Sequence, residues 1–217
     1  MEIFCRAVWG KTLIPVALQP EPANFNIRVR EPGTQFLNIN SYPQSKDWKN
    51  RDYWQRCLPQ LYESYRGICA YSAEWIPLET GVATVDHYTP KSIAPNLAYE
   101  WNNYRLASLK LNSRKGNFQD VIDPFLLTDG NFQLDFPSLI VKPNSTESEQ
   151  RINSIDATIK RLKLNGESAI KSRIRWIKPY CKDEIGFHFL LQNAPFIGFE
   201  LQRQNLKMQI KNIMRFD

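Results

Sequence analysis

The segment TVDHYTPKS, residues 84–92, carries one of the two histidines of the 217-residue chain, directly after an aspartate. Before it, ICAYSAEWIP and VATVDHY are separated by LETG, and this pattern predicts two short strands joined by a turn. After it, a loop leads to NNYRLASLKLNSRKG, residues 102–116, which predicts a short helix that ends at Gly116. The expected order is therefore strand, strand, loop, helix. Taken alone, Asp86–His87 is more typical of a structural histidine at a strand end than of a catalyst.

Two asparagines change this interpretation. Asn103 follows His87 by sixteen residues, and Asn112 follows Asn103 by nine and is succeeded by SRKG. The string resembles the HNH nuclease family, also called the ββα-metal family, in which DH ends the first strand pair and a second asparagine opens an NxxKG tail. The resemblance covers residues 68–117, about a quarter of the chain. It implies an α+β fold with a ββα-metal core.

The resemblance also implies a role for each residue. His87 would be the general base, since a neutral imidazole with a pKa of about 6.5 accepts a proton from water at pH 7. Asp86 and Asn112 would hold one Mg²⁺ or Mn²⁺ through oxygen atoms, which such ions prefer. Asn103 would hold the loop and orient His87. Two plainer interpretations stay open, in which Asn103 only caps a helix and Asn112 is a solvated polar residue.

Five cations lie close to these residues along the chain, and the net charge of +6 is compatible with a polyanionic partner. They are expected to neutralise backbone phosphates of a nucleic acid. The alternative is a solvated basic face, which is common. The candidate nucleic-acid-binding residues are Lys91, Arg105, Lys110, Arg114 and Lys115.

The sequence departs from the many HNH proteins that carry two CxxC pairs and a structural zinc. The corresponding positions hold Cys69 and Ser72, then Ser108 and Leu111. Because zinc requires thiolate or imidazole donors in a closed tetrahedron, no structural zinc is expected. Packing would hold the core instead, through Ile68, Tyr71, Trp75, Trp101 and Leu111.

The rest of the chain divides by pattern into three regions. Residues 1–46, rich in proline and turns, predict an arm of strands and loops in which FNIRV alternates like a short strand. Residues 47–125 would be the HNH core, preceded by a helix over 47–66 that Pro59 splits. Residues 126–217 predict a mostly helical lobe, with a hairpin signal at Asp129–Gly130, helices over 147–178 divided at Gly166, and a last helix over 200–214.

These features together predict a metal-dependent endonuclease that acts on DNA. The flanking segments ICAY, DHYTPKS, YEWNNYRLA, KGN and DPF resemble HNH proteins of bacterial anti-phage and retron-type systems, which implies an ATPase or another defence-system subunit as partner. The alternatives are a catalytically silent nucleic-acid-binding or scaffolding subunit and an RNA-cleaving nuclease. No signal peptide or membrane-spanning run is recognised, so a cytoplasmic location is expected.

Overall fold

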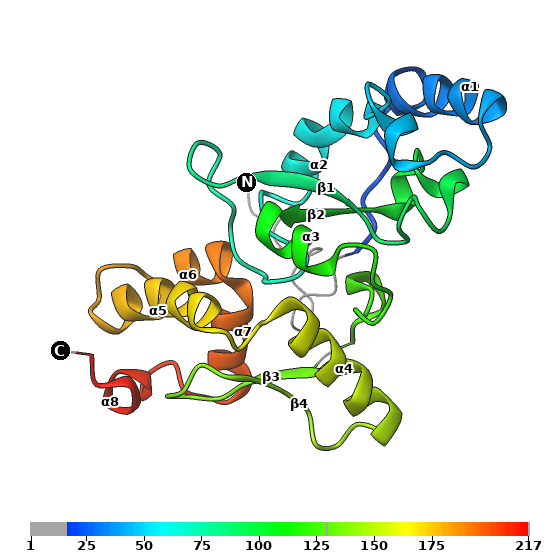
Figure 1. Ribbon diagram of the computed structural model, residues 1–217. Helices are drawn as coiled ribbons and strands as arrows, with labels where there is room; N and C mark the ends of the chain where they lie inside the picture. Colours follow the sequence, from blue (N-terminus) through cyan, green and yellow to red (C-terminus); the bar gives the residue numbers. More distant parts are fainter. Residues whose placement is uncertain (1–16, 129, 217) are drawn as a thin grey trace. The chain divides into compact units, whose positions relative to one another are not determined.

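The computed structural model describes residues 17–128 and 130–216, and it is a mixture of helices and small sheets (Figure 1). This agrees with the expected α+β class. The described chain forms two compact units, one of residues 17–121 and one that contains residues 122–217. Residues 17–46 of the predicted arm belong to the first unit, and residues 1–16 lie outside the described residues. The predicted boundaries at 46/47 and 125/126 stay predictions.

The first unit begins with a helix where the sequence predicted a strand. A π-helical turn, Asn26–Arg30, runs directly into α1, Glu31–Ile39. The expected strand FNIRV is wrong because Phe25 and Val29, four residues apart, are both buried, which is a helical spacing. Gly33 continues this buried face, and a Cβ there would lie 2.1 Å from Cγ of Tyr99. The absence of a side chain therefore permits α1 to pack on the Tyr99 ring.

The predicted helix over 47–66 is present as three shorter elements. These are the 3₁₀ turns Ser45–Trp48 and Tyr53–Cys57 and the helix α2, Leu58–Ser64. Pro59 lies in the first turn of α2, where its missing N–H leaves no hydrogen bond unmade. Gly67 follows with φ +70°, a left-handed conformation that glycine adopts without strain.

The central feature of this unit is a two-stranded antiparallel sheet followed by a helix (Figure 1). Strand β1, Ala83–His87, pairs with β2, Tyr104–Ser108, with Asp86 opposite Arg105 and His87 opposite Tyr104. Helix α3, Leu109–Lys115, starts at once, and the Ser108 hydroxyl caps it by accepting a hydrogen bond from the Leu111 N–H at 3.4 Å.

Two local predictions in this region are wrong. The first expected strand, ICAYSAEWIP, forms only an isolated bridge between Ile68 and Trp75. The expected helix over 102–116 is a strand in its middle part, because residues 104–107 are buried on both faces and pair along β1. Two 3₁₀ turns, Pro95–Leu97 and Trp101–Asn103, lie in the loop before β2. The observed order is therefore strand, loop, strand, helix.

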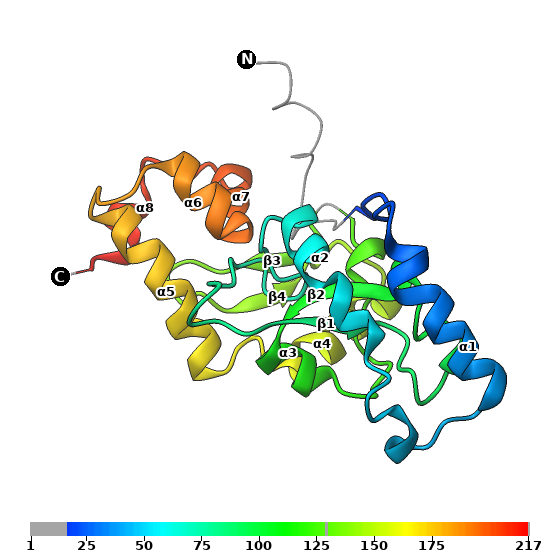
Figure 2. The same ribbon diagram turned by 90° about the horizontal axis from the view of Figure 1, so that it is seen from above.

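The second unit is mostly helical, as expected for residues 126–217. After a 3₁₀ turn, Pro124–Leu126, strands β3, Phe132–Leu134, and β4, Val141–Pro143, form a second antiparallel pair (Figure 2). Helix α4 packs against β4. The helices are α4, Glu149–Leu162; α5, Glu167–Cys181; α6, Phe187–Asn193; α7, Pro195–Arg203; and α8, Ile210–Met214.

The helix predictions for this unit are partly confirmed. Gly166 divides α4 from α5 as expected, since it is the N-cap of α5. The single helix expected over 200–214 is replaced by the end of α7 and by α8. The hairpin signal is misplaced, because Gly130 precedes β3 and the β3–β4 turn is formed by residues 135–140. Among the described helices, none combines the length and the apolar composition needed to cross a lipid bilayer.

Candidate active site

His87 ends β1 in a nearly closed aromatic environment. Its ring packs edge-on against Trp54 and Tyr104, with ring centroids 4.7 and 5.3 Å away, and the residue is only 9% exposed. Nε2 lies 2.8 Å from the carbonyl oxygen of Ala98. Because a carbonyl can only accept, Nε2 carries the proton of the neutral ring and Nδ1 keeps the lone pair. The geometry therefore assigns Nδ1 as the basic nitrogen.

The protonation of His87 is dominated by burial. Burial lowers the pKa of His87 to about 3, the Ala98 carbonyl opposes this, and the positive charges of Lys91 and Lys115 add to it. The imidazole is therefore neutral at pH 7. A neutral ring with a fixed tautomer can accept a proton without first having to lose one.

Asn103 holds the loop that follows His87. Its Oδ1 accepts a hydrogen bond from the Thr89 N–H at 2.8 Å, and its Nδ2 donates to the carbonyls of Thr89 and Leu97, both at 3.0 Å. Its own carbonyl accepts from the Tyr88 N–H at 2.9 Å. Asn103 caps no α-helix, since β2 follows it, so the cap-only interpretation is wrong. Leu97 directly precedes Ala98, whose carbonyl binds the His87 ring. By holding Leu97, Asn103 therefore supports the orientation of the His87 ring indirectly.

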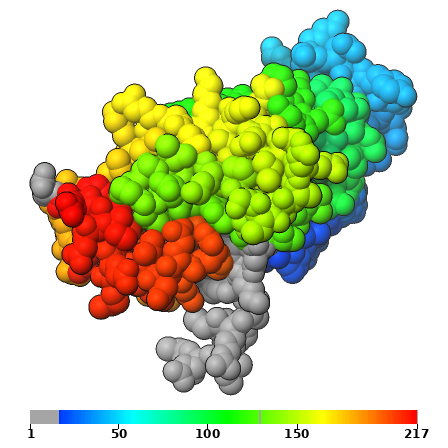
Figure 3. Space-filling model, turned by 90° about the horizontal axis from the view of Figure 1, so that it is seen from below, coloured from blue at the N-terminus to red at the C-terminus, as the bar shows by residue number. Residues whose placement is uncertain are grey.

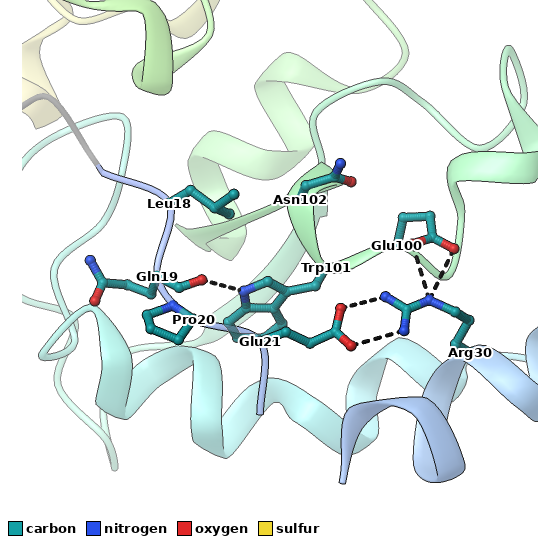
Figure 4. Close-up of a pocket in the computed structure, with 8 residues that line it drawn as sticks. All are labelled: Leu18, Gln19, Pro20, Glu21, Arg30, Glu100, Trp101 and Asn102. Carbon is teal, nitrogen blue, oxygen red and sulfur yellow. Dashed lines mark hydrogen bonds and ion pairs between the residues drawn. The ribbon is translucent and has the colours of Figure 1, made fainter. Parts of the chain in front are cut away.

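A second set of contacts closes the loop from the outer side (Figure 4). The Trp101 indole N–H donates to the Gln19 carbonyl at 2.8 Å. Arg30 pairs with Glu100 at 3.1 Å and with Glu21 on its other side. These groups line a cavity of about 410 Å³ with Leu18, Pro20 and Asn102. The segment from Leu18 to Arg30 therefore fixes the turn that ends at Asn103.

Asp86 lies on the other face of β1 and is nearly inaccessible. Its Oδ1 is 3.1 Å from Nζ of Lys115, and its Oδ2 accepts a hydrogen bond from the Tyr71 hydroxyl at 2.5 Å. Lys115 also donates to the His87 carbonyl at 2.8 Å. Burial raises the pKa of Asp86, while the neighbouring Lys115, Tyr71 and Arg105 lower it. The pair ties α3 to the end of β1.

Asn112 lies one helical turn before Lys115 and contacts the same strand. Its Nδ2 donates to the Thr84 hydroxyl at 3.0 Å and is 3.4 Å from the Val85 carbonyl. These bonds orient the side chain, and its Oδ1 accepts no hydrogen bond from the described residues. Asn112 is half-buried and held by β1, so it is not simply a solvated polar side chain.

The five predicted phosphate-binding cations occupy different environments. Lys115 and Arg105 are buried, at 0% and 3% exposure, and Arg105 donates to the carbonyls of Asn102 and Tyr104. A surface contact with phosphate does not fit this placement, and both are structural cations in this conformation. Lys110 is exposed and Arg114 half-buried on α3.

Lys91 lies against the aromatic rings that enclose His87. Its Nζ lies 5.7 Å from the Trp48 ring and 5.1 Å from the Trp54 ring, and Trp54 is also the ring that packs on His87. Burial lowers the pKa of Lys91, and the charge of Asp86 raises it. Lys91 is thus held by two aromatic faces beside the candidate base.

The positions that would hold a structural zinc are linked by other contacts. The Ser108 N–H donates to Cys69 Sγ at 3.4 Å, the Ala70 N–H donates to the Leu106 carbonyl at 2.8 Å, and Ser108 caps α3 towards Leu111. Of the expected packing residues, Tyr71, Trp101 and Leu111 are buried, whereas Trp75 is 38% exposed. Hydrogen bonds and apolar packing join this segment to β2 and α3.

Sequence reasoning missed the groups that fix Asp86 and His87. Tyr71 was assigned to packing alone, and Trp54 was given no role at the site. The Tyr104 hydroxyl donates to the Ala98 carbonyl at 2.8 Å, so that oxygen receives both Tyr104 and His87. Tyr71, Trp54 and Ala98 come from segments outside β1 and β2, so only the packing of the whole unit brings these groups together, and no local sequence pattern predicts it.

The donor chemistry of Asp86 and Asn112 fits a hard divalent cation. A carboxylate oxygen retains a second acceptor site beside the partner it already has, and the free Oδ1 of Asn112 is an oxygen donor on the adjacent helix. Among the described residues no cluster of three or more His, Cys, Asp or Glu side chains surrounds a metal position. With only Asp86 and Asn112 as protein ligands, an ion bound here would keep several waters and share Asp86 with Lys115.

No protein-family model matches the chain, and no protein of curated function matches it significantly.

Proposed function

We propose that the protein is a metal-dependent endonuclease of the HNH type that hydrolyses phosphodiester bonds in DNA. The observation that carries the proposal is the placement of Asp86 and His87 at the end of β1, with β2 paired to it and α3 following at once. The helix sets Asn112 against the same strand. The observed order strand, loop, strand, helix, with Asp86 and His87 on the first strand and Asn112 on the helix, supports a ββα-metal core.

His87 is the general base in this proposal. Its neutral ring accepts a proton from the attacking water at Nδ1, while Nε2–H stays on the Ala98 carbonyl. A pKa of about 3 in the free protein makes a weak base. A phosphate placed beside Lys91 adds negative charge close to the ring and raises its proton affinity. The substrate itself would therefore strengthen the base.

Asp86 and Asn112 would hold Mg²⁺ or Mn²⁺. When bound, the ion supplies positive charge for the phosphate and for the leaving oxygen. Lys91 adds a second positive charge on the side of His87, held there by Trp48 and Trp54. Asn103 holds the loop between His87 and Lys91 through its hydrogen bonds to Thr89, so that the two side chains keep their relative positions.

The biological setting is part of the same proposal. The protein would act in the cytoplasm as the effector of a bacterial anti-phage system, together with an ATPase or another subunit of that system. The flanking segments that resemble such nucleases support this.

A second candidate is a catalytically silent subunit that binds nucleic acid or serves as a scaffold. One observation favours it, because Lys115 and Tyr71 already engage both oxygens of Asp86 inside the protein. In that case the Asp86–Lys115 pair would serve stability alone.

Side-by-side digestion separates these candidates. Supercoiled plasmid, single-stranded DNA and total RNA are each incubated with the full chain in Mg²⁺, Mn²⁺ or EDTA. The proposal predicts EDTA-sensitive cleavage of DNA. Cleavage of RNA alone would mean that the substrate is RNA and not DNA. If the protein bound nucleic acid but cleaved none of the three substrates, the silent subunit would be favoured.

A further inference from the structure

A row of basic side chains follows the exposed face of α5. Lys171, Arg175 and Lys178 of α5 and its C-cap residue Lys182 recur at spacings of four, three and four residues, which places them along one side of the helix and its end. Ile177 is buried on the opposite side. At a rise of 1.5 Å per residue the row is about 16 Å long. We refer to these four residues as the α5 basic stripe.

The members of the stripe are open to solvent to different degrees. The Lys171 side chain is 71% exposed, and its ion pair with Glu167 joins two exposed groups at 2.6 Å, an arrangement that contributes little stability. Arg175 and Lys182 are exposed, and Arg175 has no ion pair among the described residues. Lys178 is half-buried, with Nζ 5.7 Å from the Phe216 ring.

The C-terminal end of the stripe meets further cations from the segment around α8. The Tyr180 hydroxyl donates to the Lys207 carbonyl at 3.2 Å, and Lys211 pairs with Asp183 at 2.5 Å. The Lys207 ammonium itself lies 4.0 Å from the Phe187 ring. In Figure 3 the yellow to gold segments, which include α5, and the red C-terminal segment both lie on the surface of this unit. Lys207 therefore adds a cation from a segment distant in sequence, whereas the charge of Lys211 is offset by Asp183.

We propose that the α5 basic stripe binds the phosphate backbone of the nucleic acid on which the protein acts. A straight row of same-sign charges matches a polyanion whose charges also repeat along a line, and it reads no base sequence. The choice of nucleic acid as the polyanion rests on the proposed function. A membrane surface fits less well, because an interfacial helix exposes its apolar face, whereas Ile177 of α5 is buried.

Binding is tested without cleavage. Fluorescence anisotropy of a labelled 30-base-pair duplex is measured with the full chain in EDTA, from about 50 to 200 mM salt, the range over which phosphate contacts weaken strongly. The stripe variant is Lys171→Gln with Arg175→Gln. The matched control is Lys46→Gln with Lys49→Gln, which removes the same charge from two exposed positions in the first unit.

The stripe variant is expected to bind about tenfold more weakly at low salt, with a log–log salt slope smaller by about 1.8, since each duplex phosphate contact contributes about 0.9. The control should change affinity by less than about twofold by the same reasoning. Equal losses in both variants, or none in either, would overturn the inference, as would stripe-dependent binding to phosphatidylserine vesicles without binding to DNA.

The binding and cleavage results are independent. A protein that binds through the stripe but cleaves nothing would refute the nuclease and leave the inference standing. A protein that nicks plasmid but binds equally well without the stripe would refute the inference alone.

Discussion

The buried pair of Asp86 and Lys115 makes a sharp quantitative prediction. The two side chains are 3% and 1% exposed, and their atoms are 3.1 Å apart. Replacing Lys115 by Met leaves a buried carboxylate with only the Tyr71 hydroxyl and removes the donor to the His87 carbonyl. Breaking a buried pair in this way costs about 3–5 kcal/mol of the free energy of unfolding. For a chain of this size, that corresponds to a fall in melting temperature of roughly 10 °C.

The assay is urea unfolding followed by tryptophan fluorescence, because four of the six tryptophans lie in the unit of residues 17–121. The double variant Asp86→Leu with Lys115→Met should recover most of the lost stability, since it leaves no buried charge. The cost of Lys115→Met should also shrink as the pH falls towards 4, because protonation of Asp86 removes that charge. A cost below about 1 kcal/mol, the range of an exposed pair, would refute the reasoning.

Three further predictions concern other contacts. Asn103→Asp places a carboxylate oxygen against two backbone carbonyls, so it should lower the free energy of unfolding by about 2–4 kcal/mol in the same urea assay; an unchanged midpoint would contradict the loop's dependence on this side chain. The folded pKa of His87 is about 3, so the unfolded state binds more protons below the ordinary pKa. The stability that the neutral ring contributes is therefore fully present above about pH 6.5. It is lost as the pH falls, so that the free energy of unfolding is lower by about 2 kcal/mol at pH 5. Comparing wild type with His87→Gln at pH 7 and pH 5 isolates this loss, because the raised pKa of Asp86, which acts in the opposite direction, is present in both. Gly33→Ala inserts a methyl group into the Tyr99 ring and should destabilise by about 1–3 kcal/mol or more, whereas Thr34→Ala, at an exposed position, should not; thermal melts that rank the two equally would argue against this packing.

The sequence predicted the parts of the fold that are encoded by local signals. Gly166 and Pro59 mark element boundaries correctly because each acts through its own backbone. It failed where tertiary pairing decides. YRLAS has helical neighbours in sequence but becomes β2, since its backbone hydrogen bonds go to β1. FNIRV alternates like a strand, but the packing of Phe25 and Val29 on one face makes it helical.

The candidate site was predictable as a set of residues but not as an arrangement. The spacing of Asp86, His87, Asn103 and Asn112 selected groups that lie on β1, its following loop and α3. The partners of these residues come from segments distant in sequence, which no spacing predicts. Charge alone likewise did not distinguish the exposed Lys110 from Lys115, which is fully buried. Burial is a property of the whole packed unit, and no window of sequence contains it.

The most direct test of the central claim is plasmid nicking by three proteins in Mg²⁺, Mn²⁺ and EDTA. These are the wild type, His87→Gln, which keeps an amide donor for the Ala98 carbonyl but has no base, and His188→Gln, which changes an exposed histidine of the other unit. We expect EDTA-sensitive nicking by wild type and His188→Gln, and a loss of about 100-fold or more in His87→Gln, the usual contribution of a general base. Equal nicking by all three folded proteins would contradict the role of His87.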